Sequence, residues 1–225
     1  MVIGQSQQQL VQNTSQTSIG IMEKMTKVSD FKIEPVPRSA IQSFVHKWHY
    51  SHDTNGVQQT QCFALFDDMK MIGAMIYALP SMKSTAAKYN PINPDRCWEL
   101  RRLCCIDDTP KNTESYFISQ CHKWIKQNTD VEVIVSFADL EEGHEGIIYK
   151  ASNFHYLGQT GGGTKLSVDG VLRHNRSLNQ SKRTFGRTLK RRYEAGDPDV
   201  FQVQVKPKNI YVYYLNKKIK KKLLK

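Results

Sequence analysis

The stretch Val131–Asp139, VEVIVSFAD, decides the fold class of this chain. It is a short run dominated by β-branched residues, and such a run predicts a strand that is buried on both faces. The run ends in Ser136, Phe137 and Asp139. Ligands gather at the carboxyl ends of strands in open α/β sheets, so Ser136 and Asp139 are candidate site residues. A carboxylate at this position would equally suit a simple cap on the following turn.

Helix and strand patterns alternate on both sides of this strand. They predict a helix over 38–50, a hairpin with strands at 62–66 and 71–79, a strand over 98–106, a helix over 116–128, a short helix over 147–153 and a strand over 154–160. This order predicts an α/β fold of mixed α+β character, in which helices flank a central twisted mixed sheet.

The excess positive charge lies in the last quarter of the chain. Residues 173–225 carry sixteen Lys and Arg against three acids, whereas residues 1–172 carry sixteen bases and eighteen acids. A basic segment on a near-neutral body favours polyanions through phosphate contacts and counterion release. A solvated tail that only aids solubility is the alternative. A membrane surface ranks lower, because the basic segment has no amphipathic helix with an aromatic face.

Composition divides the chain into four segments. We expect a flexible Gln/Ser-rich tail over 1–28, a catalytic core over 29–172, a basic region packed on or completing the core over 173–216, and a mobile Lys-rich tail over 217–225. The N-terminal residues lack the pattern of a secretory signal, and the five cysteines include no CxxC pair. These features predict reduced thiols and a cytoplasmic protein.

Two groups of polar residues outside the VEVIVSFAD stretch are candidates for chemistry. His49 and Tyr50, in the WHYSH segment 48–52, lie at a predicted helix end and could transfer protons near neutral pH, or could simply face water. A divalent metal site of the His/carboxylate type is a second hypothesis, although the sequence spacing of its members matches no ligand pattern. Its members would be His49, Glu99, Asp139 and His144.

The order of several motifs resembles one family. WHYSH, GAMIYALP, ELRRLCCID, PKNTESYFIS, VIVSFAD and GHEGIIYKASNFHYLGQT follow one another, with a basic C-terminal region after them. Together they resemble the Mom-type DNA-modification proteins of bacteriophage Mu and related phages, over roughly residues 38–195. The resemblance implies a GNAT-like acyltransferase fold. It also implies conversion of adenine in double-stranded DNA to N6-(carbamoylmethyl)adenine, which protects the DNA from host restriction in the host cytoplasm.

The resemblance suggests a role for each candidate residue. The residues expected in catalysis are His49, Tyr50, Ser136, Asp139 and Tyr149. Those expected to bind the donor are Arg101, Arg102, Lys111, Asn112, Thr113 and Ser115. Those expected to hold DNA phosphates are Arg183, Arg187, Lys190, Arg191 and Arg192. A flipped adenine would stack on aromatic groups such as Tyr50, Phe154 or Tyr156.

One segment departs from the acyl-CoA-dependent GNAT enzymes. They usually carry Q/R-x-x-G-x-G/A before the helix that binds pyrophosphate, whereas residues 107–115 read DDTPKNTES and contain no glycine. This departure argues against acetyl-CoA and leaves an aminoacyl donor such as charged tRNA as the hypothesis, with RNA as the donor carrier. A divalent metal and a homodimer are left open. The alternatives are a GNAT acyltransferase or aminoacyl transferase acting on another substrate, and a non-catalytic DNA-binding protein with a GNAT-like core.

Overall fold

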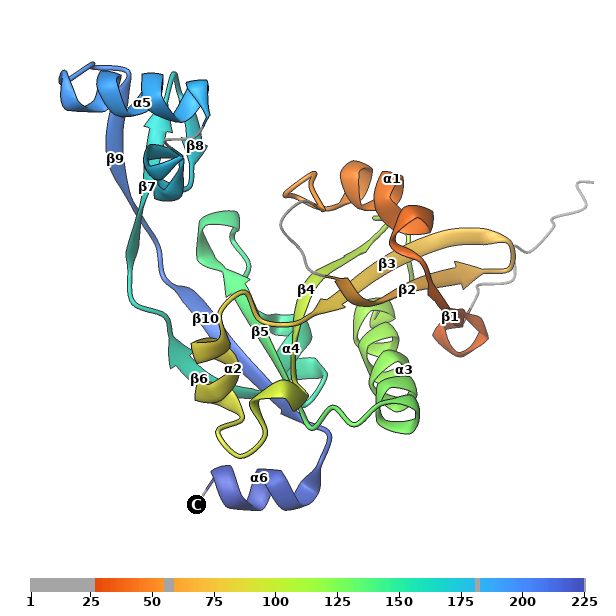
Figure 1. The fold of residues 1–225 in the computed structure, drawn as a ribbon. Helices are drawn as coiled ribbons and strands as arrows, with labels where there is room; N and C mark the ends of the chain where they lie inside the picture. The colour runs from red at the N-terminus through yellow and green to blue at the C-terminus, as the bar shows by residue number, and fades with distance from the viewer. Residues whose placement is uncertain (1–26, 55–58, 181–182, 225) are drawn as a thin grey trace, which may run out of the picture.

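A seven-stranded sheet forms the core of the computed structural model, which describes residues 27–54, 59–180 and 183–224 (Figure 1). Its strands lie in the order β1-β2-β3-β4-β5-β10-β6. They are β1 (Lys32–Val36), β2 (Gln59–Asp67), β3 (Lys70–Ala78), β4 (Cys97–Cys105), β5 (Val133–Asp139), β10 (Lys208–Tyr214) and β6 (His155–Gln159). Within the described residues, β4 and β5 are the parallel pair of this sheet, and the other neighbours are antiparallel.

Helices cover both faces of this sheet. The helices α3 (Thr113–Asn128) and α4 (Ile147–Ala151) pack on one face. On the other face lie α1 (Arg38–Trp48), over β2 and β3, and the pair α2 (Lys83–Tyr89) and α6 (Lys217–Leu223), over β5 and β10. Short 3-10 turns complete the core at η1 (Val28–Asp30), η2 (Pro94–Arg96) and η3 (Leu140–Glu142).

The position of β5 inside the sheet explains why its sequence is apolar almost without interruption. Ile134 and Ala138 face the cluster beneath α3, whereas Val133 and Val135 face the cluster beneath α2 and α6. Both faces of the strand are therefore covered, as the VEVIVSFAD pattern predicts. The α/β fold with a mixed sheet flanked by helices is confirmed, and α3 provides the connection between the parallel strands β4 and β5.

A second, three-stranded sheet carries most of the basic region. Its order is β8-β7-β9, with β7 at Gly163–Val168, β8 at Val171–Arg173 and β9 at Val200–Val205. Between β8 and β9 come η4 (Asn175–Asn179) and α5 (Thr184–Glu194). Leu189 of α5 is buried against Leu166, Val168 and Val200. We call residues 160–207 the arm, because they project from the ends of β6 and β10 (Figure 1).

The arm begins earlier in the chain than the segment boundary predicted at 172/173. The charge changes sign at Arg173, but that residue ends β8, inside a sheet that begins at Gly163. The basic region also divides in space, since β10 completes the core sheet while the preceding residues belong to the arm. The lysine-rich segment 217–223, expected to be a mobile tail, forms α6, because Ile219 is buried against the core. The expected tail 1–28 lies almost entirely outside the described residues.

Burial of His122 in α3 makes the stability of the fold depend on pH. Its ring lies among aromatic rings, 4.4 Å from that of Tyr213 and 5.5 Å from that of Phe154 (centroid distances). Burial lowers the pKa of His122 from 6.5 to about 3. The unfolded chain therefore binds a proton below pH 6.5 that the folded chain does not bind until near pH 3.

We expect the free energy of unfolding to fall by about 1.4 kcal/mol per pH unit through His122 as the pH decreases from 6.5 toward 3. Urea unfolding followed by circular dichroism at pH 5.5, 5.0 and 4.5 measures this slope. The His122→Phe variant keeps an aromatic ring and removes the titration, so its slope should be smaller by that amount. Equal slopes in the two proteins would contradict the assignment.

Candidate active site at the separation of β4 and β5

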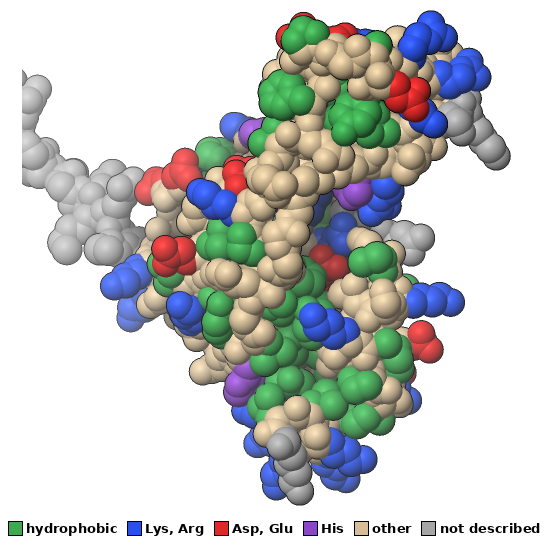
Figure 2. Space-filling model, turned by 90° about the vertical axis from the view of Figure 1, so that its left-hand side faces the viewer, with side chains coloured by type: hydrophobic (Ala, Val, Ile, Leu, Met, Phe, Trp, Pro, Cys, Tyr) green, Lys and Arg blue, Asp and Glu red, His purple; other side chains and the backbone are tan. Residues whose placement is uncertain are grey.

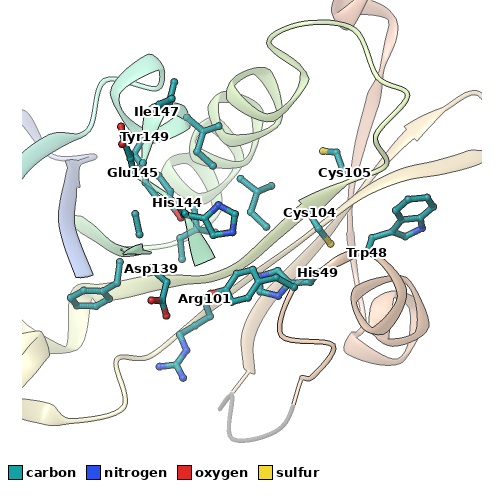
Figure 3. A pocket seen from close by; sticks show the side chains of 18 residues that line it. Trp48, His49, Arg101, Cys104, Cys105, Asp139, His144, Glu145, Ile147 and Tyr149 are labelled. Carbon is teal, nitrogen blue, oxygen red and sulfur yellow. The ribbon is translucent and has the colours of Figure 1, made fainter. Parts of the chain in front are cut away.

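A cleft opens where the parallel strands β4 and β5 separate. Their pairing ends at Leu100 and Ser136, and Ser136 Oγ donates to the Leu100 carbonyl at 3.1 Å. Beyond this point β4 continues alongside β3, and β5 continues alongside β10 as far as Asp139. The cleft has a volume of about 390 Å³, and side chains from β4, β5, α4 and the end of α1 line it (Figure 3).

A bulge in β4 lies at the point of separation. Tyr77 of β3 pairs with Leu100 and Ile76 pairs with Arg102, which leaves Arg101 as an additional residue in β4. A bulge bends its strand and redirects the side chains there. Arg101 lines the cleft, and its Nη1 donates to Glu99 at 3.2 Å and to Ser81 Oγ at 2.6 Å. Arg102 donates instead to the Asp53 carbonyl at 3.1 Å, outside the residues that line the cleft.

Three rings form a stack at one wall of the cleft. The ring of Tyr50 lies 4.2 Å from that of His49 and 5.1 Å from that of His144 (centroid distances). His49 immediately follows α1 and is only 4% exposed, whereas Tyr50 is 42% exposed. His49 and Tyr50, predicted as catalytic candidates, both line the cleft, and so does His144, which the sequence analysis named as a possible metal ligand.

His49 is a neutral hydrogen-bond donor in this arrangement. Burial lowers its pKa from 6.5 to about 4, and the positive charge of Arg102 acts in the same direction. Its Nδ1 accepts from the Ser51 backbone N–H at 3.1 Å and lies 2.8 Å from Ser51 Oγ. A neutral imidazole that accepts at Nδ1 carries its proton on Nε2. His49 is therefore suited to polarising a carbonyl rather than to removing a proton.

Asp139 is held in its ionised form at the end of β5. Burial raises its pKa, but a hydrogen bond and the charge of Lys208 outweigh burial and lower the pKa below its ordinary value. Lys208 Nζ lies 2.6 Å from Asp139 Oδ2, and the Glu141 backbone N–H donates to Oδ1 at 3.2 Å. The carboxylate also begins η3, so the capping role and the site role coincide.

Tyr149 of α4 remains protonated across the physiological range. Burial raises its pKa to about 12, although a hydrogen bond with the Ser136 side chain opposes this shift. Its ring packs against those of Tyr211 and Phe154. Gly146 precedes α4 at φ +85°, and a Cβ there would come within 2.2 Å of the Tyr211 ring. Only glycine permits this approach, which positions the start of α4 against the sheet.

The predicted donor-binding residues divide into two groups. Arg101 lines the cleft, but the residues around the start of α3 do not. Thr113 is fully buried and donates to the Pro110 carbonyl at 2.6 Å, and Ser115 donates to the Asn112 carbonyl at 3.0 Å. Lys111 is exposed, and Asn112 is the left-handed residue before α3. The loop between β4 and α3 therefore lies away from the cleft, although it directly follows β4 in the sequence.

Two of the three aromatic residues expected to stack on adenine are located elsewhere. Phe154 is buried in the core, 7% exposed, and packs against His122 and Tyr149. Tyr156 is exposed on β6 and does not line the cleft. Tyr50 is the one of the three that lines it.

Side chains with metal-binding donors do not converge in the part of the chain that the structure describes. No group of three or more His, Cys, Asp and Glu residues could hold an ion there. Three of the four residues of the metal hypothesis, His49, Asp139 and His144, line the cleft, but Glu99 is instead paired with Arg101. Burial raises the pKa of Glu99 despite that ion pair.

The basic residues of α5 have two different environments. Arg183, Arg187, Lys190 and Arg191 are exposed, and Figure 2 shows Lys and Arg side chains at the outer end of the arm. Arg192 differs from the expectation, because it holds the arm together. Its Nη2 lies 2.7 Å from Asp169 and its Nε lies 2.6 Å from Asp197.

Lys208 is the site residue that sequence reasoning missed. The sequence grouped it with the other bases of the C-terminal region, although β10 places it directly opposite Asp139. The apolar alternation IYVYYL predicts the strand, but no local pattern indicates which strand it pairs with. The ion pair follows only from the insertion of β10 between β5 and β6.

The described structure thus combines splayed parallel strands, a bulge in β4 and a basic arm. A model of the Mom protein family matches residues 30–225, and the chain belongs to this family. Over 126 residues it is 34% identical to the methylcarbamoylase Mom of Escherichia phage Mu. The match covers 56% of this chain and 51% of the phage Mu protein, about half of that relative's length.

Solved structures with a similar arrangement are N-acetyltransferases. A spermidine/spermine N-acetyltransferase of Vibrio cholerae is 10% identical with a TM-score of 0.47, covering 86% of this chain and 98% of that one. The ribosomal-protein-S18-alanine N-acetyltransferase of Escherichia coli is 9% identical with a TM-score of 0.47, covering 83% and 94%. No helix in the described residues is long and apolar enough to cross a membrane.

Removal of Lys208 should raise the pKa of Asp139, because burial would then act against a carboxylate that has lost its ion pair. We expect this in Lys208→Gln, measured by carbon-detected NMR of the Asp139 carboxyl during a pH titration. Lys206→Gln removes the same charge from an exposed position nearby and should leave the titration almost unchanged. A similar shift in both variants would indicate a general charge effect rather than the observed contact.

Proposed function

We propose that this protein modifies DNA for a phage, converting adenine to N6-(carbamoylmethyl)adenine in the host cytoplasm and so protecting the DNA from restriction. The observation that carries the proposal is the cleft between β4 and β5 in a member of the Mom family. This cleft is lined by the neutral His49, the ionised Asp139 and the protonated Tyr149. Groups whose environments push their pKa values apart are typical of acid–base sites.

In this proposal the target adenine leaves the base stack, because its N6 amine is hard to approach within a base pair. Tyr50 is the exposed ring of the His49–Tyr50–His144 group, and the base packs against its exposed part. Asp139 accepts a hydrogen bond from N6. The amine becomes acidic only as its new bond to carbon forms, so a carboxylate of low pKa is a sufficient proton acceptor at that moment.

His49 and Tyr149 act on the donor. The N6 nitrogen forms its new bond to the CH2 carbon of the donor unit while the bond between that carbon and its leaving group breaks. The Nε2–H of His49 donates to the adjacent carbonyl oxygen, and the hydroxyl of Tyr149 gives its proton to the leaving group. The donor supplies a glycine-like unit, and a charged tRNA remains our hypothesis for its carrier. Modification in a purified system that contains no RNA would refute that hypothesis while leaving the cleft chemistry intact.

In this proposal the arm holds DNA over the cleft. Its C-terminal end meets β10 at Lys208, which pairs with Asp139, and the Lys206 backbone N–H donates to Glu141 at 2.6 Å. The exposed cations in α5 or directly before it are Arg183, Arg187, Lys190 and Arg191, and these would contact phosphates. Arg192 is omitted from this set because it is committed to Asp169 and Asp197.

Mass spectrometry of nucleosides from plasmid DNA, after expression of the protein in bacteria, tests the function. We expect an adenine species in which a carbamoylmethyl group replaces one hydrogen. Tyr149→Phe keeps the ring packing and should slow modification by about 10²-fold or more. Tyr156→Phe is the matched control outside the cleft and should be unaffected. Unmodified DNA from folded wild-type protein in several hosts would refute the function.

Asp139→Ala should abolish modification while DNA binding persists, because the arm supplies the phosphate contacts. Gel-shift assays and nucleoside analysis on the same samples measure the two properties separately. Full modification by this variant would remove Asp139 from the mechanism.

The double variant Arg187→Gln/Arg191→Gln should weaken binding to duplex DNA uniformly across sequences. The slope of log K against log salt concentration should decrease in magnitude by about 2, since each lost phosphate contact contributes roughly 0.9. Fluorescence anisotropy between low and moderate salt measures this slope. Lys70→Gln, at the exposed β2–β3 turn, provides the single-charge control. An unchanged slope in the double variant would place the DNA contacts elsewhere.

A further inference from the structure

A second cavity lies on the α3 and α4 face of the sheet, outside the cleft. It has a volume of about 500 Å³ and runs along α3 toward the C-terminal end of β10. The cavity and the cleft are lined by successive parts of the same segment. Gly146–Tyr149 line the cleft, and Ala151–Asn153 line the cavity. Its size is that of a pocket for a small-molecule ligand.

The charge of this cavity favours an anion. Lys123 and Lys126 of α3 and Lys217 at the start of α6 contribute positive charge. Among the described residues that line it, none is Asp or Glu, and most of the polar ones carry hydroxyl or amide groups. A surface of lysines and neutral donors without carboxylates is typical of sites that bind phosphate.

Two buried polar atoms in its lining have no partner in the described structure. His122 is 4% exposed and Ser152 is 8% exposed, yet His122 Nε2 and Ser152 Oγ make no hydrogen bond there. An unsatisfied buried polar atom is destabilising, because it has lost its hydrogen bonds to water and gained none in the protein. Two such atoms on one cavity wall indicate that a polar ligand completes their hydrogen bonding.

Aromatic rings complete the cavity. Tyr213 and Tyr214 of β10 line it, and the ring of Tyr213 lies 4.4 Å from that of His122. Nucleobases stack on such rings whatever their identity. A ligand with a planar base and a phosphate would therefore contact both the aromatic rings and the lysines of the cavity.

We propose that this cavity is a binding site for a mononucleotide, with the phosphate held by Lys123, Lys126 and Lys217 and the remaining polar groups bonded to His122 and Ser152. The proposal does not depend on the DNA-modifying activity. Asn112 and Ser115, two of the predicted donor-binding residues, line the end of the cavity at the first turn of α3, whereas Lys123 and Lys126 lie in the second half of that helix.

NMR titration of the full chain with 5′-AMP, observing the His122 ring, tests the proposal. We expect a saturable shift of the His122 resonances, and binding at least about 10-fold weaker in Lys123→Gln/Lys126→Gln. The control Lys32→Gln/Lys70→Gln removes equal charge from exposed positions on β1 and β3 and should bind like the wild type. Ser152→Ala should also weaken binding, without loss of surface charge.

Three results would overturn the proposal. The first is no saturable shift with AMP, or the same affinity in both double variants. The second is equal affinity for inorganic phosphate and AMP, because the base would then contribute nothing. The third is displacement of AMP by a short DNA duplex in stoichiometric amount, because the cavity would then belong to the DNA surface.

Discussion

The Ser136 side chain donates to the Leu100 carbonyl at the last paired position of β4 and β5, and the site depends on the separation that begins there. The parallel pairing holds the bases of the two strands together, while the bulge at Arg101 directs β4 toward β3. Beyond it, β5 stays with β10. The cleft is therefore a consequence of backbone pairing, and the side chains around it occupy a space that the sheet has already opened.

Three environments around this cleft prepare three different protonation states. Burial keeps His49 neutral and keeps Tyr149 protonated, whereas the ammonium group of Lys208 keeps Asp139 ionised against the effect of burial. In the proposed mechanism these three groups act as a carbonyl-polarising group, a proton donor and a proton acceptor, and none of them shares a proton with another. The His/carboxylate metal site of the sequence analysis does not form among the described residues, and the proposed mechanism uses the same residue types through their charge and burial.

The sequence predicts the elements of this fold better than their partners. The apolar run of β5, the helix at 38–50 and the hairpin at 62–79 follow from local periodicity, and the structure contains each of them. The opposition of Lys208 and Asp139 could not be predicted, because strand order is a non-local property. Charge counting likewise located the basic region. It could not separate Arg192, which acidic residues of the arm neutralise, from the exposed Arg187.

The arm is an insertion between two strands that lie side by side in the core. It leaves after β6 and returns at β10, where the Thr160 N–H donates to the Lys208 carbonyl and the Lys208 N–H donates to Thr160 Oγ1, both at 2.9 Å. A short reverse turn could join the strands at that point, and the arm has a small hydrophobic cluster of its own. The protein is in this sense modular, because the pairing of β6 with β10 does not require the arm and an insertion of another size would fit the same junction.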